Sequence, residues 1–253
     1  MALRESTQVD THVQEIAAGI FRLSTFVSTA GGAGGMTYNQ FLILGDEPML
    51  FHCGQKALFP AVSAAASRVL DLKHLRWIGY SHLEADECGA LNDWLQAAPG
   101  STVVHGRMGC NLWLNDQALR PPRMLADGEV LALGGKRMRF IATPHVPHCW
   151  DAALFYEEAT GTLFTSDLLT QFGPAQAVTS ADILGPATAL ELKLKFTPIS
   201  AQTAPTVRRL ADLNPAMLAI MHGPSYSGPG QAVLEGLAGF YDAELRKGAA
   251  AGG

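Results

Sequence analysis

The protein has 253 residues, of which 48% are hydrophobic and 16% are charged, and its formal net charge is −5. This balance excludes a disordered chain, and because no run reaches about 18 apolar residues it also excludes a membrane-spanning helix. The acidic balance argues against a surface that follows nucleic-acid phosphates. We therefore expect a soluble domain with neither nucleic acid nor membrane as a partner.

The N-terminus and the cysteines indicate a cytoplasmic protein. Residues 1–12 lack the basic and apolar segments of a signal peptide, so we expect no export. The four cysteines are far apart and form no C-x-x-C pair, which is typical of reduced thiols. We expect all four to pack as small hydrophobic residues.

The first half of the chain opens with β-rich segments and continues with alternating helices and strands. Residues 1–13 are polar and expected to be loose, and the glycine-rich residues 28–36 are expected to form a mobile hairpin loop. Pro60 marks the start or a kink of the first helix. The pattern predicts strands at 21–27, 38–44, 48–52, 75–81 and 101–106, and helices at 55–70, 87–98 and 110–119.

The second half repeats this order of strands followed by helices. A hairpin is expected at 129–143, strands at 152–158, 162–169 and 217–223, and helices at 188–196, 204–213 and 231–247. Two β-rich halves, each followed by helices, predict an α/β (α+β) fold of two packed sheets with helices outside, an αββα sandwich. Without a visible repeat or linker, we expect one domain over residues 1–253, with a core at about 14–247 and disordered ends.

The densest functional signal lies between a predicted strand and the helix that follows it. His82, Glu84 and Asp86 alternate there, so an extended loop turns all three side chains toward one point. Crowded carboxylates repel one another unless a cation compensates, and a metal ion does so while keeping imidazole neutral as a ligand. The alternative is a solvated acidic turn that caps the next helix.

Three later loops carry similar side chains. His148 lies in a proline-stiffened loop with His145 and is the better ligand candidate of the two, whereas Asp167 and His222 each follow a predicted strand. Function concentrates on loops that a rigid scaffold carries, so four strand-end loops with metal-binding groups predict one shared site. Three imidazoles and three carboxylates favour iron or manganese, although zinc tolerates such a shell.

The order His-x-Glu-x-Asp, His, Asp, His, on a chain that opens with TYNQFLILGDEPMLFHCG, resembles the metallo-β-lactamase fold. Within that fold it is similar to the diiron domain of flavodiiron proteins and their oxygen-binding relatives. The resemblance covers about residues 20–225 and implies an αββα sandwich of the metallo-β-lactamase type. Zinc hydrolases of this fold usually show His-x-His-x-Asp-His, whereas Glu84 stands here in place of the second histidine.

The resemblance also implies a set of six metal ligands and a function. One iron would be bound by His82, Glu84 and His148, the other by Asp86 and His222, and Asp167 would bridge them. Such a pair of ions could bind or reduce dioxygen or nitric oxide, or could activate a bridging water for hydrolysis, and the ligand types favour the first. The alternatives are a metal-dependent hydrolase of the same fold and a non-catalytic oxygen sensor.

Two residues depart from the family pattern. Glu87 stands where the family usually has a histidine beside the second iron, and it either ligates as a fourth carboxylate or points away and caps the helix; we favour the cap. His52 stands where fold relatives commonly carry aspartate, and we interpret it as a hydrogen-bonded histidine near the floor of the site. Near the ligand loops, Trp150 could wall the pocket, Asp151 could orient an imidazole and Tyr226 could line the entrance.

The electron supply is expected to come from outside this chain. Flavodiiron proteins usually continue into a flavodoxin-like domain that holds flavin mononucleotide, and nothing after residue 225 can form a doubly wound βαβ unit. The glycines at 31–35 are not a G-x-G-x-x-G motif between a strand and a helix. We therefore expect no flavin here, a separate electron donor, and, from the resemblance alone, a possible homodimer.

Overall fold

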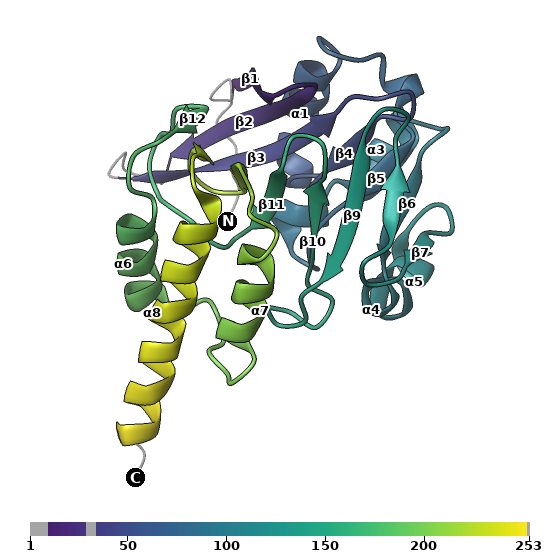
Figure 1. The fold of residues 1–253 in the computed structure, drawn as a ribbon. Helices are drawn as coiled ribbons and strands as arrows, with labels where there is room; N and C mark the ends of the chain where they lie inside the picture. Colours follow the sequence, from purple (N-terminus) through teal and green to yellow (C-terminus); the bar gives the residue numbers. More distant parts are fainter. Residues whose placement is uncertain (1–9, 29–33, 252–253) are drawn as a thin grey trace, which may run out of the picture.

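The computed structural model describes residues 10–28 and 34–251, and it contains two seven-stranded sheets (Figure 1). In the first sheet the strands follow chain order, antiparallel as far as β4 and parallel from β4 to β7. They are β1 (Thr11–Ala17), β2 (Ile20–Ser28), β3 (Gly35–Ile43), β4 (Met49–Phe51), β5 (Trp77–Gly79), β6 (Thr102–Gly106) and β7 (Arg123–Leu125).

The second sheet has the order β12-β14-β13-β11-β10-β9-β8. Its central pair, β11 and β13, is parallel, so both strands end at the same edge of the sheet. The strands are β8 (Val130–Ala132), β9 (Arg137–Ala142), β10 (Ala153–Glu157), β11 (Thr162–Ser166), β12 (Val178–Thr179), β13 (Met217–Ile220) and β14 (Ser225–Ser227).

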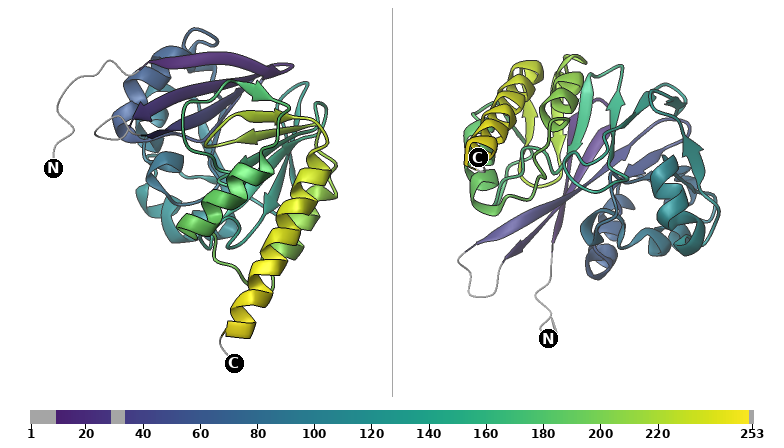
Figure 2. Two further views of the ribbon diagram at one scale, coloured as in Figure 1. Left: turned by 90° about the vertical axis from the view of Figure 1, so that its left-hand side faces the viewer. Right: turned by 90° about the horizontal axis from the view of Figure 1, so that it is seen from below.

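Helices cover the outer face of each sheet, as both views in Figure 2 show. The first sheet carries α1 (Phe59–Ala66), α2 (Ala85–Cys88), α3 (Leu91–Ala97), α4 (Arg107–Gly109) and α5 (Asn115–Gln117), with short turns η1 (Lys56–Leu58) and η2 (Leu72–His74) and a π-helical turn η3 (Cys110–Leu114). The second carries α6 (Leu184–Leu194), α7 (Thr203–Ala211) and α8 (Gly230–Ala251). The predicted αββα sandwich is thus confirmed.

The space between the sheets is filled by interlocked aromatic rings. Phe41 and Phe51 of the first sheet meet Phe155 and Phe164 of the second edge-on, with ring centroids 5.3 to 5.5 Å apart. All four are buried, and burying one such side chain stabilises a fold by roughly 1.5–3 kcal/mol. This packing fixes the two sheets relative to each other, and with them the loops at their strand ends.

Backbone hydrogen bonds also join the two halves at the edge where functional loops were predicted. The Ala153 amide donates to the Ser81 carbonyl at 2.9 Å, and the Asn39 amide donates to the Met221 carbonyl at 3.1 Å. Each bond links a strand or loop of one sheet to a loop of the other. The end of β5 is therefore tied to β10, and the end of β13 to β3, by the main chain as well as by side-chain packing.

Some local expectations differ from the structure. Thr11–Val13, expected to be loose, belong to the edge strand β1, which pairs with β2 from Thr11↔Thr25 onward. Regular structure also runs to Ala251, beyond the expected bound at 247. The expected mobile loop at 28–36 falls partly on 29–33, which lie outside the described residues. Among the residues that are described, no helix is long and apolar enough to span a membrane.

Candidate metal centre

All six residues predicted as ligands lie together where the two sheets meet. His82 follows β5, and Glu84 and Asp86 lie at the start of α2. His148 comes from the loop between β9 and β10, Asp167 follows β11, and His222 follows β13. The four loops converge because β5 of the first sheet and the parallel strands β11 and β13 of the second all end at this edge.

A first group forms around two imidazole nitrogens. One oxygen of Glu84, Oε2, lies 3.0 Å from Nε2 of His82 and 2.9 Å from Nε2 of His148. Oδ2 of Asp167 lies 3.4 Å from the same two nitrogens. The ligand atoms of these four residues all fall within 4.8 Å of one another, which is close enough to surround one metal ion.

A second group shares Asp167 with the first. Nε2 of His222 lies 3.2 Å from Oδ2 of Asp86 and 3.2 Å from Oδ1 of Asp167. The two oxygens of Asp167 thus face different groups. Oδ1 is buried and has no aligned hydrogen-bond donor among the described residues, so a cation would satisfy an atom that the protein leaves unsatisfied. The donor set fits two divalent ions with a shared carboxylate.

Local backbone geometry aims Asp167 into the site. The register between β11 and β13 shifts between Phe164 and Ser166, and Ser166 has φ +51°, in the left-handed region. Such a conformation costs a non-glycine residue of order 1–3 kcal/mol and persists only where the surroundings enforce it. The strained residue ends the strand and turns the next side chain toward the imidazoles.

The ring of His222 is held by β3. Its Nδ1 lies 2.8 Å from the carbonyl oxygen of Thr37, which can only accept, so Nδ1 carries the hydrogen. In the neutral ring, Nε2 then presents its lone pair to the site, the tautomer that a metal ligand needs. Asn39 Nδ2 donates to the carbonyls of Ile220 and Gly223, which fixes the turn that carries His222.

His82 and His222 hold protons more tightly here than free histidine does. Burial lowers the pKa of His82, but its hydrogen bond to Glu84 and the surrounding carboxylates outweigh burial and raise this pKa to about 9. Burial also lowers the pKa of His222, yet Asp167 and Asp86 raise it to about 10. Hydrogen bonds from two imidazoles hold the pKa of Glu84 well below its usual value. Protons thus occupy the site where cations would otherwise compensate the carboxylates.

A small cavity opens over the centre. It has a volume of about 180 Å³ and is walled by apolar side chains next to the carboxylates. Trp150 and Tyr226, expected to wall the pocket and line its entrance, are not among its lining residues: Trp150 is 61% exposed on another surface and Tyr226 is buried under the helices. The apolar lining consists of Met36, Phe172, Leu194 and Phe196.

Glu87 points away from the ligand groups, as favoured, but it does not cap a helix. Its carboxylate is buried and forms an ion pair with His52, with Oε2 2.8 Å from Nε2, so it neither caps a helix nor faces the Nε2 side of the imidazoles. Burial would raise the pKa of Glu87, but the charge of His52 lowers it. His52 is hydrogen-bonded near the floor of the site, as expected, and its Nδ1 contacts Sδ of Met221 at 2.9 Å.

The expected role of Asp151 is not borne out by the geometry. Its Oδ2 and Nδ1 of His148 are both buried atoms without a hydrogen-bond partner among the described residues. The carboxylate therefore does not orient that imidazole.

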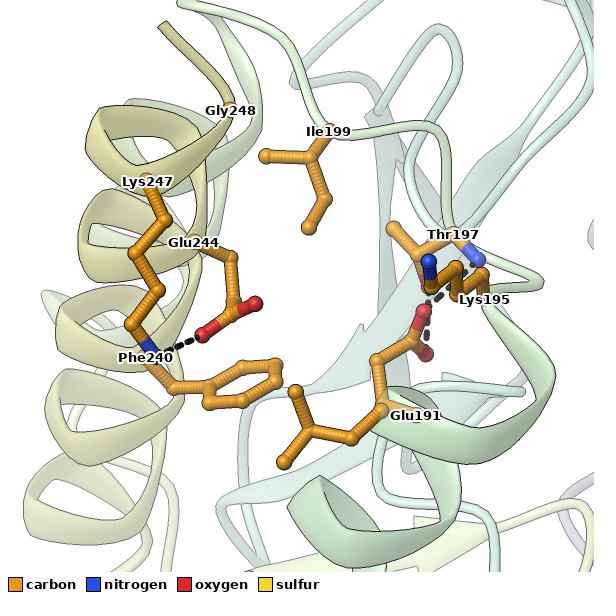
Figure 3. Close-up of a pocket in the computed structure, with 9 residues that line it drawn as sticks. Glu191, Lys195, Thr197, Ile199, Phe240, Glu244, Lys247 and Gly248 are labelled. Carbon is orange, nitrogen blue, oxygen red and sulfur yellow. Dashed lines mark hydrogen bonds and ion pairs between the residues drawn. The ribbon is translucent and has the colours of Figure 1, made fainter. Parts of the chain in front are cut away.

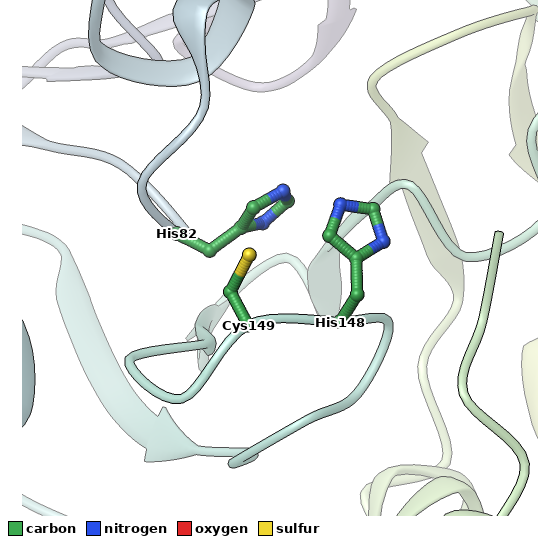
Figure 4. Close-up of side chains that lie close together, drawn as sticks. All are labelled: His82, His148 and Cys149. Carbon is green, nitrogen blue, oxygen red and sulfur yellow. The ribbon is translucent and has the colours of Figure 1, made fainter.

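Cys149 lies beside the first group, and sequence reasoning did not connect it with the site. Three of the cysteines are buried, as expected, but Cys149 is only half-buried, and its sulfur and a nitrogen of each of His82 and His148 lie within 4.8 Å of one another (Figure 4). Burial and the nearby carboxylates raise the pKa of this thiol to about 11. Its position directly after His148 was the only signal in the sequence.

We expect Cys149→Ser to leave the metal content unchanged. The Nε2 atoms of His82 and His148 already face carboxylate oxygens, and those carboxylates oppose formation of a thiolate beside them. Cobalt(II) tests this directly, because a sulfur ligand would add an intense charge-transfer band in the near ultraviolet. The band should be absent from the native protein. Its presence, and its loss in Cys149→Ser, would instead make the thiolate a ligand.

Comparisons with known proteins identify the family and the fold of this chain. A profile of the family described as "ODP family beta lactamase" matches residues 36–223. A putative diflavin flavoprotein A 1 from Nostoc sp. is 31% identical over 137 residues, which is 53% of this chain and 23% of the relative. The chain thus spans about a quarter of the length of that curated protein.

Two solved structures have the same fold at low sequence identity. Rubredoxin oxygen:oxidoreductase from Desulfovibrio gigas superposes with a TM-score of 0.77 at 17% identity, covering 91% of this chain and 61% of that one. A variant flavo di-iron protein from Thermotoga maritima gives 0.78 at 19% identity, covering 91% and 62%. At these identities the likeness establishes the fold.

Proposed function

Because this chain belongs to the family described as ODP family beta lactamase, we propose that it holds two iron ions at which dioxygen or nitric oxide is reduced. The observation that supports this most directly is the position of Asp167, whose two oxygens face two separate groups of ligands. In the proposed arrangement one ion is held by His82, Glu84 and His148, the other by Asp86 and His222, and Asp167 is shared.

The bound ions would supply open coordination positions and electron transfer. The chain's own residues do the rest. The imidazoles and carboxylates would fix the positions of the ions, and Met36, Phe172 and Leu194 would give the cavity an apolar wall that suits a small uncharged gas. Glu84, with 48% of its side chain exposed, lies at the opening.

Reduction consumes electrons, and we propose a separate reduced protein as their source. The names of the relatives refer to flavin and rubredoxin, so a reduced flavin or an iron–sulfur protein is the chemical class of donor that this proposal requires. The donor would be oxidised as the gas is reduced, with protons taken from solvent.

Anaerobic iron loading tests the proposal. We expect close to two irons per chain, a change in absorbance when the reduced protein meets oxygen, and continued oxygen uptake when a chemical reductant is supplied. Retention of zinc alone without any oxygen response would contradict the proposal, as would hydrolysis of thioester, lactone or phosphodiester substrates in place of oxygen uptake. Reversible oxygen binding without turnover would assign the site to a sensor.

A further inference from the structure

On the Nδ1 side of His82, away from the other proposed ligands, buried residues form a continuous polar network. Its five members, in order, are His52, Glu87, Ser166, Ser81 and His82. The two residues that depart from the family pattern, His52 and Glu87, are in contact at its far end. Oε1 of Glu87 accepts from the Ser166 hydroxyl at 2.9 Å, the Ser166 and Ser81 hydroxyl oxygens lie 2.6 Å apart, and the Ser81 oxygen lies 2.7 Å from Nδ1 of His82. Each of the five is no more than 1% exposed.

The carboxylate of Glu87 gives this network a direction. A hydroxyl group has one hydrogen, and the Ser166 hydroxyl donates its hydrogen to Glu87. The Ser166 oxygen must then accept from Ser81, whose own hydrogen is thereby used. The Ser81 oxygen can only accept from Nδ1 of His82. Each step leaves one possible donor, so the network places the hydrogen of the neutral His82 ring on Nδ1.

That tautomer leaves Nε2 of His82 free to bind a metal. Nε2 is the atom that faces Glu84 and Asp167 at 3.0 and 3.4 Å. Hydrogen-bond partners of this kind fix the tautomer and the orientation of a ligating imidazole, and their loss typically lowers metal affinity by about 10- to 100-fold. The network thus connects the buried ion pair with the predicted ligand position.

His52 secures the carboxylate that gives the network its direction. Oε2 of Glu87 lies 2.8 Å from Nε2 of His52 but off the N–H axis, so this contact is an ion pair rather than a linear hydrogen bond. The Ser81 amide also donates to Oε2, at 3.4 Å. These two contacts hold the Glu87 carboxylate in place at the end of the network.

We propose that the buried His52–Glu87 pair positions the metal ligand His82, acting through the hydroxyls of Ser166 and Ser81. The inference rests on the proposed role of His82 as a ligand. It makes all four residues positioning residues, since none of them faces the side of the imidazole that would meet the metal.

Glu191 provides a matched control outside this network. Like Glu87 it is a buried carboxylate with serine or threonine partners, because it accepts from the amide and the hydroxyl of Thr197 at 3.0 and 3.1 Å (Figure 3). It lines a cavity of about 470 Å³ between α6 and α8 and, among the described residues, shares no hydrogen bond with the metal centre, although it interacts electrostatically with His148. Glu191→Gln therefore removes a comparable buried charge without touching the network.

The test uses the full chain loaded with cobalt(II), whose paramagnetism shifts the proton signals of coordinated imidazoles. The native protein should show a shifted, exchangeable ring N–H signal from His82. Ser81→Ala should abolish that signal or speed its exchange, and should weaken cobalt binding by about 10- to 100-fold. Ser81→Thr, which keeps a hydroxyl, should restore both. Glu87→Gln should weaken cobalt binding as well, whereas Glu191→Gln should bind cobalt like the native protein.

The outcomes separate this inference from the proposed function. Failure of the native protein to bind cobalt would overturn the metal centre itself. Normal cobalt binding and an unchanged His82 signal in Ser81→Ala and Glu87→Gln would overturn the positioning role alone. Glu87→Gln also removes the counter-charge of His52 and so lowers stability; Ser81→Ala, which deletes a single hydroxyl, is therefore the deciding variant.

Discussion

Asp167→Ala is expected to lose most of its bound metal even when iron is supplied in excess. The substitution removes an oxygen from each ligand group at once, since Oδ2 faces His82 and His148 while Oδ1 faces His222. His222 would then retain only Asp86 as a carboxylate neighbour. Loss of a residue that only hydrogen-bonds to a ligand already lowers metal affinity by up to about 100-fold. Because Asp167 is itself a proposed ligand, we expect metal affinity to fall by more than this. Elemental analysis after anaerobic loading measures this.

Two carboxylate variants serve as controls for Asp167→Ala. Asp151→Ala removes a buried carboxylate near His148 whose Oδ2 has no hydrogen-bond partner among the described residues, so full metal content is expected. Glu87→Ala removes a member of the hydrogen-bonded network that ends at His82. Its metal site should still fill in excess iron, although with lower affinity. Equal metal content in Asp167→Ala and Glu87→Ala would show that Asp167 is not a shared ligand.

The positions of the site loops could be predicted because they follow from strand ends. A run of apolar residues that stops at a histidine or an aspartate places that side chain at the edge of a sheet, and this holds for His82, Asp167 and His222. The family resemblance, now confirmed, supplied the grouping of the six residues. The pairing register of the strands could not be predicted from the sequence. The assignment of each Asp167 oxygen to one ligand group depends on the shifted pairing of β11 with β13.

The contact between His52 and Glu87 was open to prediction but was missed. The two residues were interpreted separately. His52 is a histidine where fold relatives commonly carry aspartate, and Glu87 is a glutamate where the family usually has histidine. Taken together, the two departures exchange an acid and a base, and such an exchange is the pattern expected of two residues in contact. The sequence separation hid this, because the segments that follow β4 and contain α2 come together through tertiary contacts such as the bond from the Cys53 amide to the Glu87 carbonyl.

Short strands at and beside the sheet edges were the least predictable part of the fold. β12 and β14 have two and three residues, and they exist because Val178 pairs with Ser225 and Thr179 with Tyr226. No periodicity can develop over so few residues. The strand β1 escaped prediction for a related reason: as an edge strand it buries only two of its seven residues, so its apolar pattern is weak.

The metal-free protein is expected to lose stability as the pH rises from 6.5 to about 10. The pKa values of His82 and His222 are raised from 6.5 to about 9 and about 10 in the folded protein. Below pH 6.5 both rings are protonated in the folded and the unfolded chain, so their ion pairs contribute fully to the free energy of unfolding. Between these limits the unfolded chain releases its protons first, and each imidazole removes up to about 1.4 kcal/mol of stability per pH unit.

Saturating metal should abolish this dependence. A metal ion displaces the protons from Nε2 of His82 and His222, so its binding, and the stability that binding adds, increase as the pH rises through the same range. Thermal denaturation between pH 6.5 and 10 should therefore show stability that falls with pH in the presence of chelator and stays nearly constant with saturating cobalt(II). His222→Gln should flatten the slope of the metal-free protein, whereas His12→Gln, which changes an exposed histidine, should not. Parallel slopes with and without metal would show that these imidazoles are not where the metal binds.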